Sequence, residues 1–218
     1  MARAPRAIVA ALALAVLPAL VAIALVVLAH PWAADAAYAL PGFPEPRIAI
    51  DDDERSRLAA VGTRAIQPWR PGGIDAMRAA RRDDGRRAFV GEELDHFEDV
   101  RGVMLAFLVA GVAGLAVIAA AAGLVGDRSL VRRGLLAGTR LTLAILAVTG
   151  ALMIIGFDAF FDGFHALFFE GESWKLPNLG TARSLYPDAL WALMGGAMVA
   201  LVLAQVAAMV VLLRRSSR

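Results

Sequence analysis

Four long apolar runs constrain this chain more than any other feature of its sequence. They lie at about residues 7–29, 103–125, 138–158 and 189–213, and almost no charged residue interrupts them. A helix needs about 20 apolar residues to cross a hydrocarbon core of ~30 Å, and other backbone structures leave polar groups unpaired in lipid. The sequence therefore predicts an all-α, polytopic membrane protein with four transmembrane helices.

The length of the chain leaves room for one domain. With 218 residues and 59% apolar content, residues 1–218 are predicted to form a single membrane domain. Two segments remain outside the spans, at about 30–102 and 159–188. The chain has no cysteine, which excludes disulfides and thiolate metal sites. The net charge of +2 gives no reason to expect a nucleic-acid partner.

Arginines on the short loops predict the orientation, because basic residues on such loops mark the cytoplasmic side. With both termini cytoplasmic, segments 30–102 and 159–188 lie outside. The first run could instead be a signal peptide, but its apolar core is longer than the usual 7–15 residues, so we expect an uncleaved anchor. The arginines on the predicted inner side are Arg3, Arg6, Arg128, Arg132, Arg133, Arg214, Arg215 and Arg218.

The outer segment between the first and second spans is predicted to be mostly helical. Its acidic stretch 51–54 is typical of a capped helix start, and this helix should run to about Ile66. A second short helix is expected at 74–82, after a break at 68–73. Residues 92–101 are predicted to form a helix that continues directly into the second span.

Two histidine segments stand apart from the apolar background. His96 has Asp99 three residues after it, so both side chains share one face of the predicted helix. His165 follows Asp162 by three residues, within 157–169, a stretch that holds six of the ten phenylalanines. Each histidine taken alone is typical of an interfacial anchor, and the phenylalanines are typical of an aromatic belt. The two histidine–carboxylate pairs together favour a functional site.

A count along the chain predicts that the two histidines meet. His96 and His165 are equally distant from the midpoint of the inner turn, between residues 130 and 131. If the flanking segments are helical at ~1.5 Å per residue, both histidines reach a similar height at the outer interface. Adjacent antiparallel helices would then bring them together, unless a kink such as one at Gly156 intervenes.

The same segments resemble a known family. Glu93-Leu-Asp-His-Phe-Glu-Asp-Val-Arg101 is similar to the E-x-x-H-x-x-D-V segment of the lipoprotein intramolecular transacylase (Lit) family. The block Phe157-Asp-Ala-Phe-Phe-Asp-Gly-Phe-His-Ala-Leu-Phe-Phe169 also matches, followed by Trp174 and Tyr186-Pro187. The four-span layout agrees with this family, whereas residues 42–91 carry no part of the pattern.

The resemblance implies an enzyme of the bacterial cytoplasmic membrane that acts on diacylglyceryl-modified lipoproteins at the outer surface. It would move the sn-2 acyl chain of the glyceryl group to the α-amino group of the same N-terminal cysteine. No cofactor is needed, because turning an ester and an amine into an amide is downhill. The implied roles are catalysis by His96 and His165, orientation of their rings by Asp99 and Asp162, substrate binding by Arg101, and an acyl groove lined by Phe161, Phe164 and Phe168.

Two other functional classes stay open from the sequence. A metal-dependent membrane hydrolase could use the two histidines and the nearby acids as Zn²⁺ ligands, although no H-E-x-x-H spacing supports it. A non-enzymatic membrane scaffold would tolerate the loss of either histidine. A transporter is disfavoured because no span carries a charge near its centre.

Overall fold

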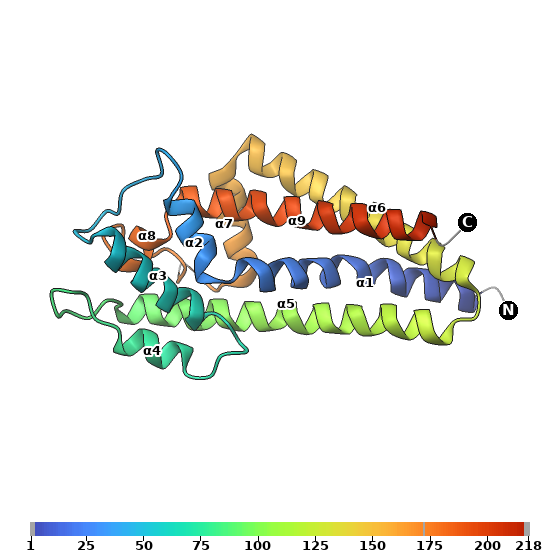
Figure 1. Ribbon diagram of the computed structural model, residues 1–218, viewed down its shortest axis with the longest axis horizontal. Helices are drawn as coiled ribbons and strands as arrows, with labels where there is room; N and C mark the ends of the chain where they lie inside the picture. The colour runs from blue at the N-terminus through green and yellow to red at the C-terminus, as the bar shows by residue number, and fades with distance from the viewer. Residues whose placement is uncertain (1–2, 172, 216–218) are drawn as a thin grey trace. The chain divides into compact units, whose positions relative to one another are not determined.

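The computed structural model describes residues 3–171 and 173–215, and this part of the chain forms nine helices and no β-strand (Figure 1). Four of these helices are long and apolar enough to cross a membrane, which confirms the predicted all-α, four-span class. The predicted inner residue Arg218 lies outside the described residues. The helices are α1 (Arg3–Leu28), α2 (Pro31–Tyr38), α3 (Asp52–Ala65), α4 (Gly73–Ala79), α5 (Gly91–Leu124), α6 (Arg128–Ile155), α7 (Phe157–Phe168), α8 (Thr181–Leu185) and α9 (Asp188–Arg215).

The chain divides into two compact units. The first comprises, among the described residues, 3–26, 106–156 and 197–215, and it contains most of the four spanning helices. Helix α1 supplies the centre of its core, because Leu12, Val16 and Ala24 on α1 are completely buried. Buried side chains of the other three spanning helices pack against this stripe: Ala121 of α5, Leu135 of α6, and Val202 and Val206 of α9.

Glycines allow two helices to approach α1 closely. A Cβ atom added at Gly114 of α5 would lie 2.5 Å from the carbonyl oxygen of Ala15, and one at Gly138 of α6 would lie 2.5 Å from the Val16 side chain. Gly111 likewise faces α1 at Ala22. The Gly111-x-x-Gly114 pattern therefore mediates close helix packing, as such small-residue pairs do in membranes.

The turn between α5 and α6 is shorter than the sequence predicts, and it lies before the predicted midpoint between residues 130 and 131. It comprises residues 125–127, and the Asp127 carboxylate caps α6 by accepting hydrogen bonds from the backbone N–H groups of Ser129 (2.9 Å) and Leu130 (3.1 Å). Gly111 and Gly114 of α5 and Gly134 and Gly138 of α6 all face α1. Helix α1 is therefore a shared packing partner of the two helices in this hairpin.

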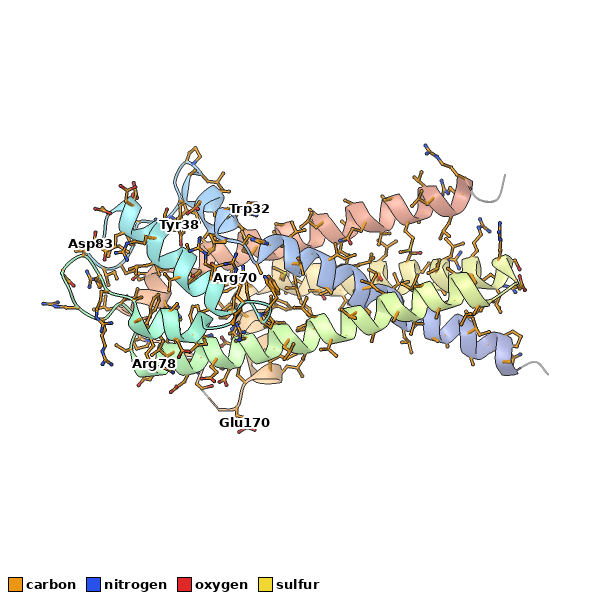
Figure 2. The ribbon with its side chains drawn as sticks, turned by 60° about the horizontal axis from the view of Figure 1, so that its bottom comes forward. Trp32, Tyr38, Arg70, Arg78, Asp83 and Glu170 are labelled. Atoms are coloured by element: carbon orange, nitrogen blue, oxygen red, sulfur yellow. The ribbon has the colours of Figure 1, made fainter. Side chains whose placement is uncertain are left out.

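The second unit comprises residues 27–105 and 157–196. Helix α3 starts where the acidic stretch predicts, because the Asp51 carboxylate accepts a hydrogen bond from the N–H of Glu54 at 2.8 Å. Helix α4 is shorter than expected and ends at Ala79. Charged side chains such as Arg78, Asp83 and Glu170 lie on the surface of this unit (Figure 2).

The core of the second unit joins its short helices to the start of α5. Its buried side chains come from α3, α4, α5, α8 and the loop before α5: Leu58, Met77, Phe89, Phe97 and Leu185. Residues 91–101 are helical and continuous with the spanning part of α5, as predicted. This continuity places His96 on a rigid helix whose neighbouring residue, Phe97, is buried in the core.

Candidate active site

His165 lies on α7, a helix separate from the third spanning helix, α6. Helix α6 ends at Ile155, and Gly156 has φ −166° and ψ 88°, which is not helical. Within α7, the His165 Nδ1 lies 2.8 Å from the carbonyl oxygen of Phe161, one turn earlier. Because a carbonyl oxygen can only accept, Nδ1 carries the hydrogen, and the Nε2 lone pair of the neutral ring is left available.

The surroundings of His165 favour its neutral form. Burial lowers the pKa of the imidazole below its ordinary value. The hydrogen bond to Phe161 and the charge of Asp162 act in the opposite direction and offset this effect only in part. His165 is therefore a neutral imidazole at physiological pH, with Nε2 free to accept a proton.

His96 lies beside His165, and the predicted proximity is confirmed. The two ring centroids are 6.4 Å apart. The Nδ1 atom of His96 is buried and has no hydrogen-bond partner among the described residues. The count of residues was partly wrong, because the turn lies at 125–127 and because Gly156 ends the third long helix before His165 is reached. The two rings meet within the second unit, with His165 on a separate helix.

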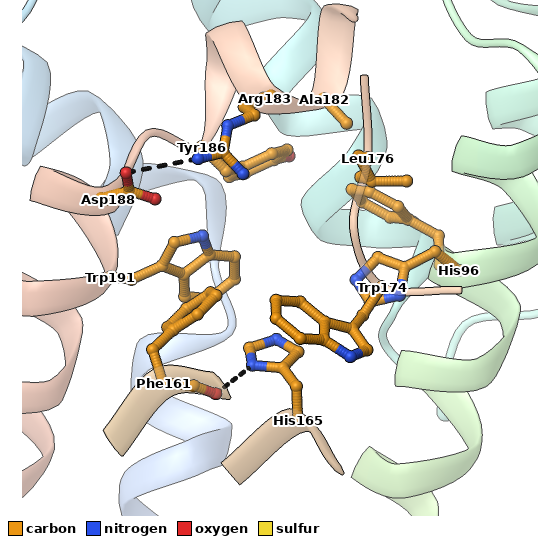
Figure 3. A pocket seen from close by; sticks show the side chains of 11 residues that line it. His96, Phe161, His165, Trp174, Leu176, Ala182, Arg183, Tyr186, Asp188 and Trp191 are labelled. Atoms are coloured by element: carbon orange, nitrogen blue, oxygen red, sulfur yellow. Dashed lines mark hydrogen bonds and ion pairs between the residues drawn. The ribbon is translucent and has the colours of Figure 1, made fainter. Parts of the chain in front are cut away.

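Both histidines line a small cavity with aromatic walls (Figure 3). Its volume is about 60 Å³, enough for a small polar group but not for an acyl chain. Against the His165 ring lie Phe161, with centroids 4.1 Å apart, and Trp174, with centroids 4.7 Å apart. The other lining residues are Phe97, Leu176, Ala182, Arg183, Tyr186, Asp188 and Trp191, and all belong to the second unit.

The two predicted supporting carboxylates do not hydrogen-bond to the imidazoles. Asp99 and Asp162 are exposed, and among the described contacts neither makes a hydrogen bond to His96 or His165. The Phe161 carbonyl orients the His165 ring instead. This carbonyl could not be foreseen from residue types, since every residue carries one.

Arg101 was predicted to bind the substrate, but its guanidinium is hydrogen-bonded to the backbone of the protein itself. Its guanidinium donates hydrogen bonds to the carbonyl oxygens of Ala65 (3.0 Å), Gln67, Pro68 (3.1 Å) and Arg70 (2.9 Å). These carbonyls belong to the end of α3 and the turn after it. Arg101 thus ties that turn to α5, and it does not line the cavity.

The three phenylalanines predicted to line an acyl groove divide into two groups. Phe161 lines the cavity beside His165. Phe164 and Phe168 do not line it; they are 42% and 36% exposed, and their rings pack together with centroids 4.9 Å apart. An exposed apolar pair beside a small cavity offers a surface on which a hydrocarbon chain can lie.

Tyr186 forms part of the cavity wall and is firmly held. Its hydroxyl donates to the carbonyl oxygen of Ala59 at 2.6 Å, and burial raises the pKa of the phenol above its ordinary value. A Cβ atom at Gly62 would lie 2.5 Å from this hydroxyl, so the glycine makes room for the ring. The sequence placed Tyr186 in the family pattern but gave no sign of this contact.

Glu93 is a buried acid that the sequence analysis did not assign to the site. It is 1% exposed, and its two carboxylate oxygens accept hydrogen bonds from different backbone N–H groups, those of Val90 (2.9 Å) and Ala182 (2.7 Å). The first lies just before α5 and the second lies in α8. Glu93 therefore links the helix of His96 to the segment that carries Arg183 and Tyr186.

A metal site would need a cluster of ligands around the histidines. Among the described residues, no group of three His, Cys, Asp or Glu side chains is arranged to hold a metal ion. The groups packed against the His165 ring are the aromatic rings of Phe161 and Trp174, and its hydrogen-bond partner is a backbone carbonyl.

Comparison with known proteins identifies the family of this chain. A sequence model of the family described as lipoprotein intramolecular transacylase Lit matches residues 77–180, which include both histidines. An uncharacterized protein of Aquifex aeolicus (strain VF5) is 31% identical over 157 residues, covering 71% of this chain and 68% of that protein. The chain belongs to the Lit family. The resemblance inferred from the two histidine segments is thereby confirmed.

A solved structure of a member of this family has the same fold. The membrane integral lipoprotein intramolecular transacylase Lit from Bacillus cereus matches with a TM-score of 0.76 and 16% sequence identity. The match covers 100% of this chain and 99% of that one. The chain is therefore a multi-pass membrane protein with the fold of the Lit family.

Proposed function

We propose that this chain moves the sn-2 acyl chain of a diacylglyceryl lipoprotein to the α-amino group of the same lipoprotein's N-terminal cysteine. The observation that carries the proposal is the His165 ring. Its Nδ1–H donates to the Phe161 carbonyl, and its Nε2, near a second histidine, makes no hydrogen bond with the described residues. This is the arrangement that a general base requires.

In the proposed reaction, the amine nitrogen attacks the ester carbonyl carbon. His165 Nε2 takes the proton that the nitrogen loses, a transfer suited to an α-amine with a pKa of about 7.7–8.0. The C–O bond to the glyceryl group then breaks, and the proton is returned to the departing glyceryl oxygen. His96, whose ring lies 6.4 Å from that of His165, donates a hydrogen bond to this oxygen.

The small cavity suits a reaction between two groups of one molecule. Its volume of about 60 Å³ accommodates the reacting ester and amine but excludes the chains. The enzyme's main contribution is then to hold the two groups in a near-attack arrangement. The acyl chain would lie along the exposed rings of Phe164 and Phe168.

We place the cavity at the outer face of the cytoplasmic membrane, with both termini inside. The arginines at the start of α6, Arg128, Arg132 and Arg133, support this orientation. Because the chain has no cysteine, single cysteines report on sidedness without background. In intact cells, a membrane-impermeant maleimide should label Arg86→Cys but not Ser129→Cys, and the reverse pattern contradicts the orientation.

The proposed activity can be tested with the full-length purified chain in detergent and a synthetic diacylglyceryl lipopeptide. The wild type should give a product of unchanged mass whose acyl chain is on the amine. His165→Ala and His96→Ala should each lose most of the rate, while Arg86→Gln, whose side chain is 81% exposed, should keep it. Equal rates in all four proteins would contradict the roles of the histidines.

The same assay separates the alternative classes. A hydrolase would release a free fatty acid and reduce the mass of the lipopeptide, and a metal-dependent one would lose activity with a chelator. A scaffold would leave the lipopeptide unchanged while both histidine variants supported normal function in cells.

A further inference from the structure

We propose that Arg183 binds the carbonyl oxygen of the ester and stabilises the oxyanion that forms when the amine attacks. This proposal rests on the proposed function and adds a catalytic residue that the sequence analysis did not identify. The group that Arg183 would bind is the carbonyl of a carboxylic ester. The hydrogen bond from the guanidinium to the carbonyl oxygen becomes stronger as negative charge develops on that oxygen.

The position of Arg183 supports this role. It lines the same cavity as His96 and His165, and among the described lining residues it is the only arginine or lysine. In Figure 3, Arg183 and His165 lie on opposite sides of the cavity. An ester placed between them would have its carbon near the base and its oxygen toward the guanidinium.

The guanidinium has hydrogen-bonding capacity to spare. Its Nε atom is buried and has no partner among the described residues. Its only described ion pair joins Nη2 to the Asp188 Oδ2 at 3.5 Å, and the Asp188 side chain is 50% exposed. A guanidinium has five N–H donors, so most of them remain for a ligand. A buried donor without a partner is costly, and a substrate oxygen would relieve that cost.

The backbone around Arg183 is held in place before any substrate arrives. The N–H of the preceding residue, Ala182, donates to the buried Glu93 carboxylate at 2.7 Å. Two residues later, the Leu185 carbonyl accepts a hydrogen bond from the Tyr38 hydroxyl at 2.6 Å. A guanidinium carried on a fixed backbone needs less reorganisation to reach a developing oxyanion than one carried on a mobile segment.

Arg183 and His165 have separate roles in the proposed reaction. As the C–N bond forms, the carbonyl oxygen gains negative charge, and Arg183 donates hydrogen bonds to it. His165 holds the proton lost by nitrogen, and the C=O bond re-forms when the glyceryl oxygen leaves. The proton then passes to that oxygen, so Arg183 donates hydrogen bonds throughout without losing its own proton.

A purely structural role is the competing explanation, because Arg183 also pairs with Asp188. If the ion pair only joins α8 to the start of α9, removing either partner should have the same effect, and removing both should have no further effect. If Arg183 acts on the oxyanion, only its own removal is severe. The two explanations therefore differ in the behaviour of Asp188→Asn.

The test measures single-turnover rates of the purified full-length chain at saturating synthetic diacylglyceryl lipopeptide, together with thermal stability. Arg183→Gln should lower the rate by roughly 10²-fold, as loss of one oxyanion donor does elsewhere, with little change in the substrate concentration for half saturation. Arg183→Lys should recover part of the rate, and Arg86→Gln should match the wild type. Asp188→Asn should reduce the rate far less than Arg183→Gln.

Two results would overturn the proposal while leaving the proposed function intact. One is a wild-type rate in Arg183→Gln. The other is an equal loss in Arg183→Gln, Asp188→Asn and the double variant, which assigns the effect to the ion pair. A wild-type chain that leaves the lipopeptide unchanged would overturn this proposal and the proposed function together.

Discussion

Replacing Glu93 with glutamine should loosen the link between α5 and α8 by a measurable amount. In the wild type, each carboxylate oxygen accepts one backbone N–H, from Val90 at 2.9 Å and from Ala182 at 2.7 Å. A glutamine keeps one acceptor, but its NH₂ group faces the other N–H. One buried donor is then left without a partner, which costs about 1–3 kcal/mol.

Hydrogen exchange measures this cost at the position where it arises. A change of about 1–3 kcal/mol corresponds to about 5- to 150-fold faster exchange of the amides in residues 177–186. Glu92→Gln is the matched control, because Glu92 is the exposed neighbour of Glu93 and should exchange like the wild type. Transacylation should fall in Glu93→Gln because Arg183 is less well held. Unchanged exchange and activity in Glu93→Gln would refute this account of the link.

Three further predictions follow from the packing and the chemistry. Below a pH of about 8, where the substrate amine titrates, the logarithm of the rate at low substrate concentration should rise with pH with a slope of one. Below the histidine pKa, which is under about 6.5, the slope should become two, because the amine and His165 must both lose a proton. A single slope throughout would contradict the role of His165 as the base. Burial lowers the pKa of His165, so its contribution to stability should be complete above a pH of about 6.5 and should decline at lower pH. The difference in thermal stability between the wild type and His165→Asn measures this contribution. A larger stabilisation by His165 at pH 5 than at pH 7 would contradict the prediction. Gly138→Leu should destabilise the bundle by about 1–3 kcal/mol through its contact with Val16, whereas Gly150→Leu, where a side chain meets nothing within 4 Å, should not; equal thermal stability of the two would contradict the packing.

The sequence predicts the membrane architecture well because that architecture depends on composition. Apolar runs long enough to cross lipid define all four spanning helices. The start of α3 is also predictable, since the Asp51 cap depends on residues three apart in the chain. These features are local, so they can be read without knowing which segments meet in space.

The site is less predictable because its contacts join distant segments. Counting residues brought His96 and His165 together, although Gly156 interrupts the helix that the count assumed. Arg101 was predicted to bind the substrate, but its guanidinium donates hydrogen bonds to four backbone carbonyls. Backbone carbonyls carry no sequence signature, so their role could come only from the structure.

Arg183 lines the cavity, although the sequence analysis did not identify it as a site residue. It lies in the predicted outer segment 159–188, where nothing in the sequence marked it as different from the other arginines. Its significance depends on the cavity that it lines and on the Glu93 carboxylate, 89 residues away in the chain from Ala182, which fixes the adjacent backbone. A long-range contact of this kind leaves no periodic pattern.

The most direct test of the account is a crossover experiment read by tandem mass spectrometry. The purified wild-type chain is mixed with two synthetic diacylglyceryl lipopeptides that differ in peptide sequence. The first carries acyl chains of normal isotopic mass, and the second carries isotopically heavy acyl chains. The account predicts that each peptide's amine receives only its own acyl chain and that total mass is unchanged. Products that pair a peptide with the other lipopeptide's chain, or that have lost a chain, would contradict intramolecular transfer.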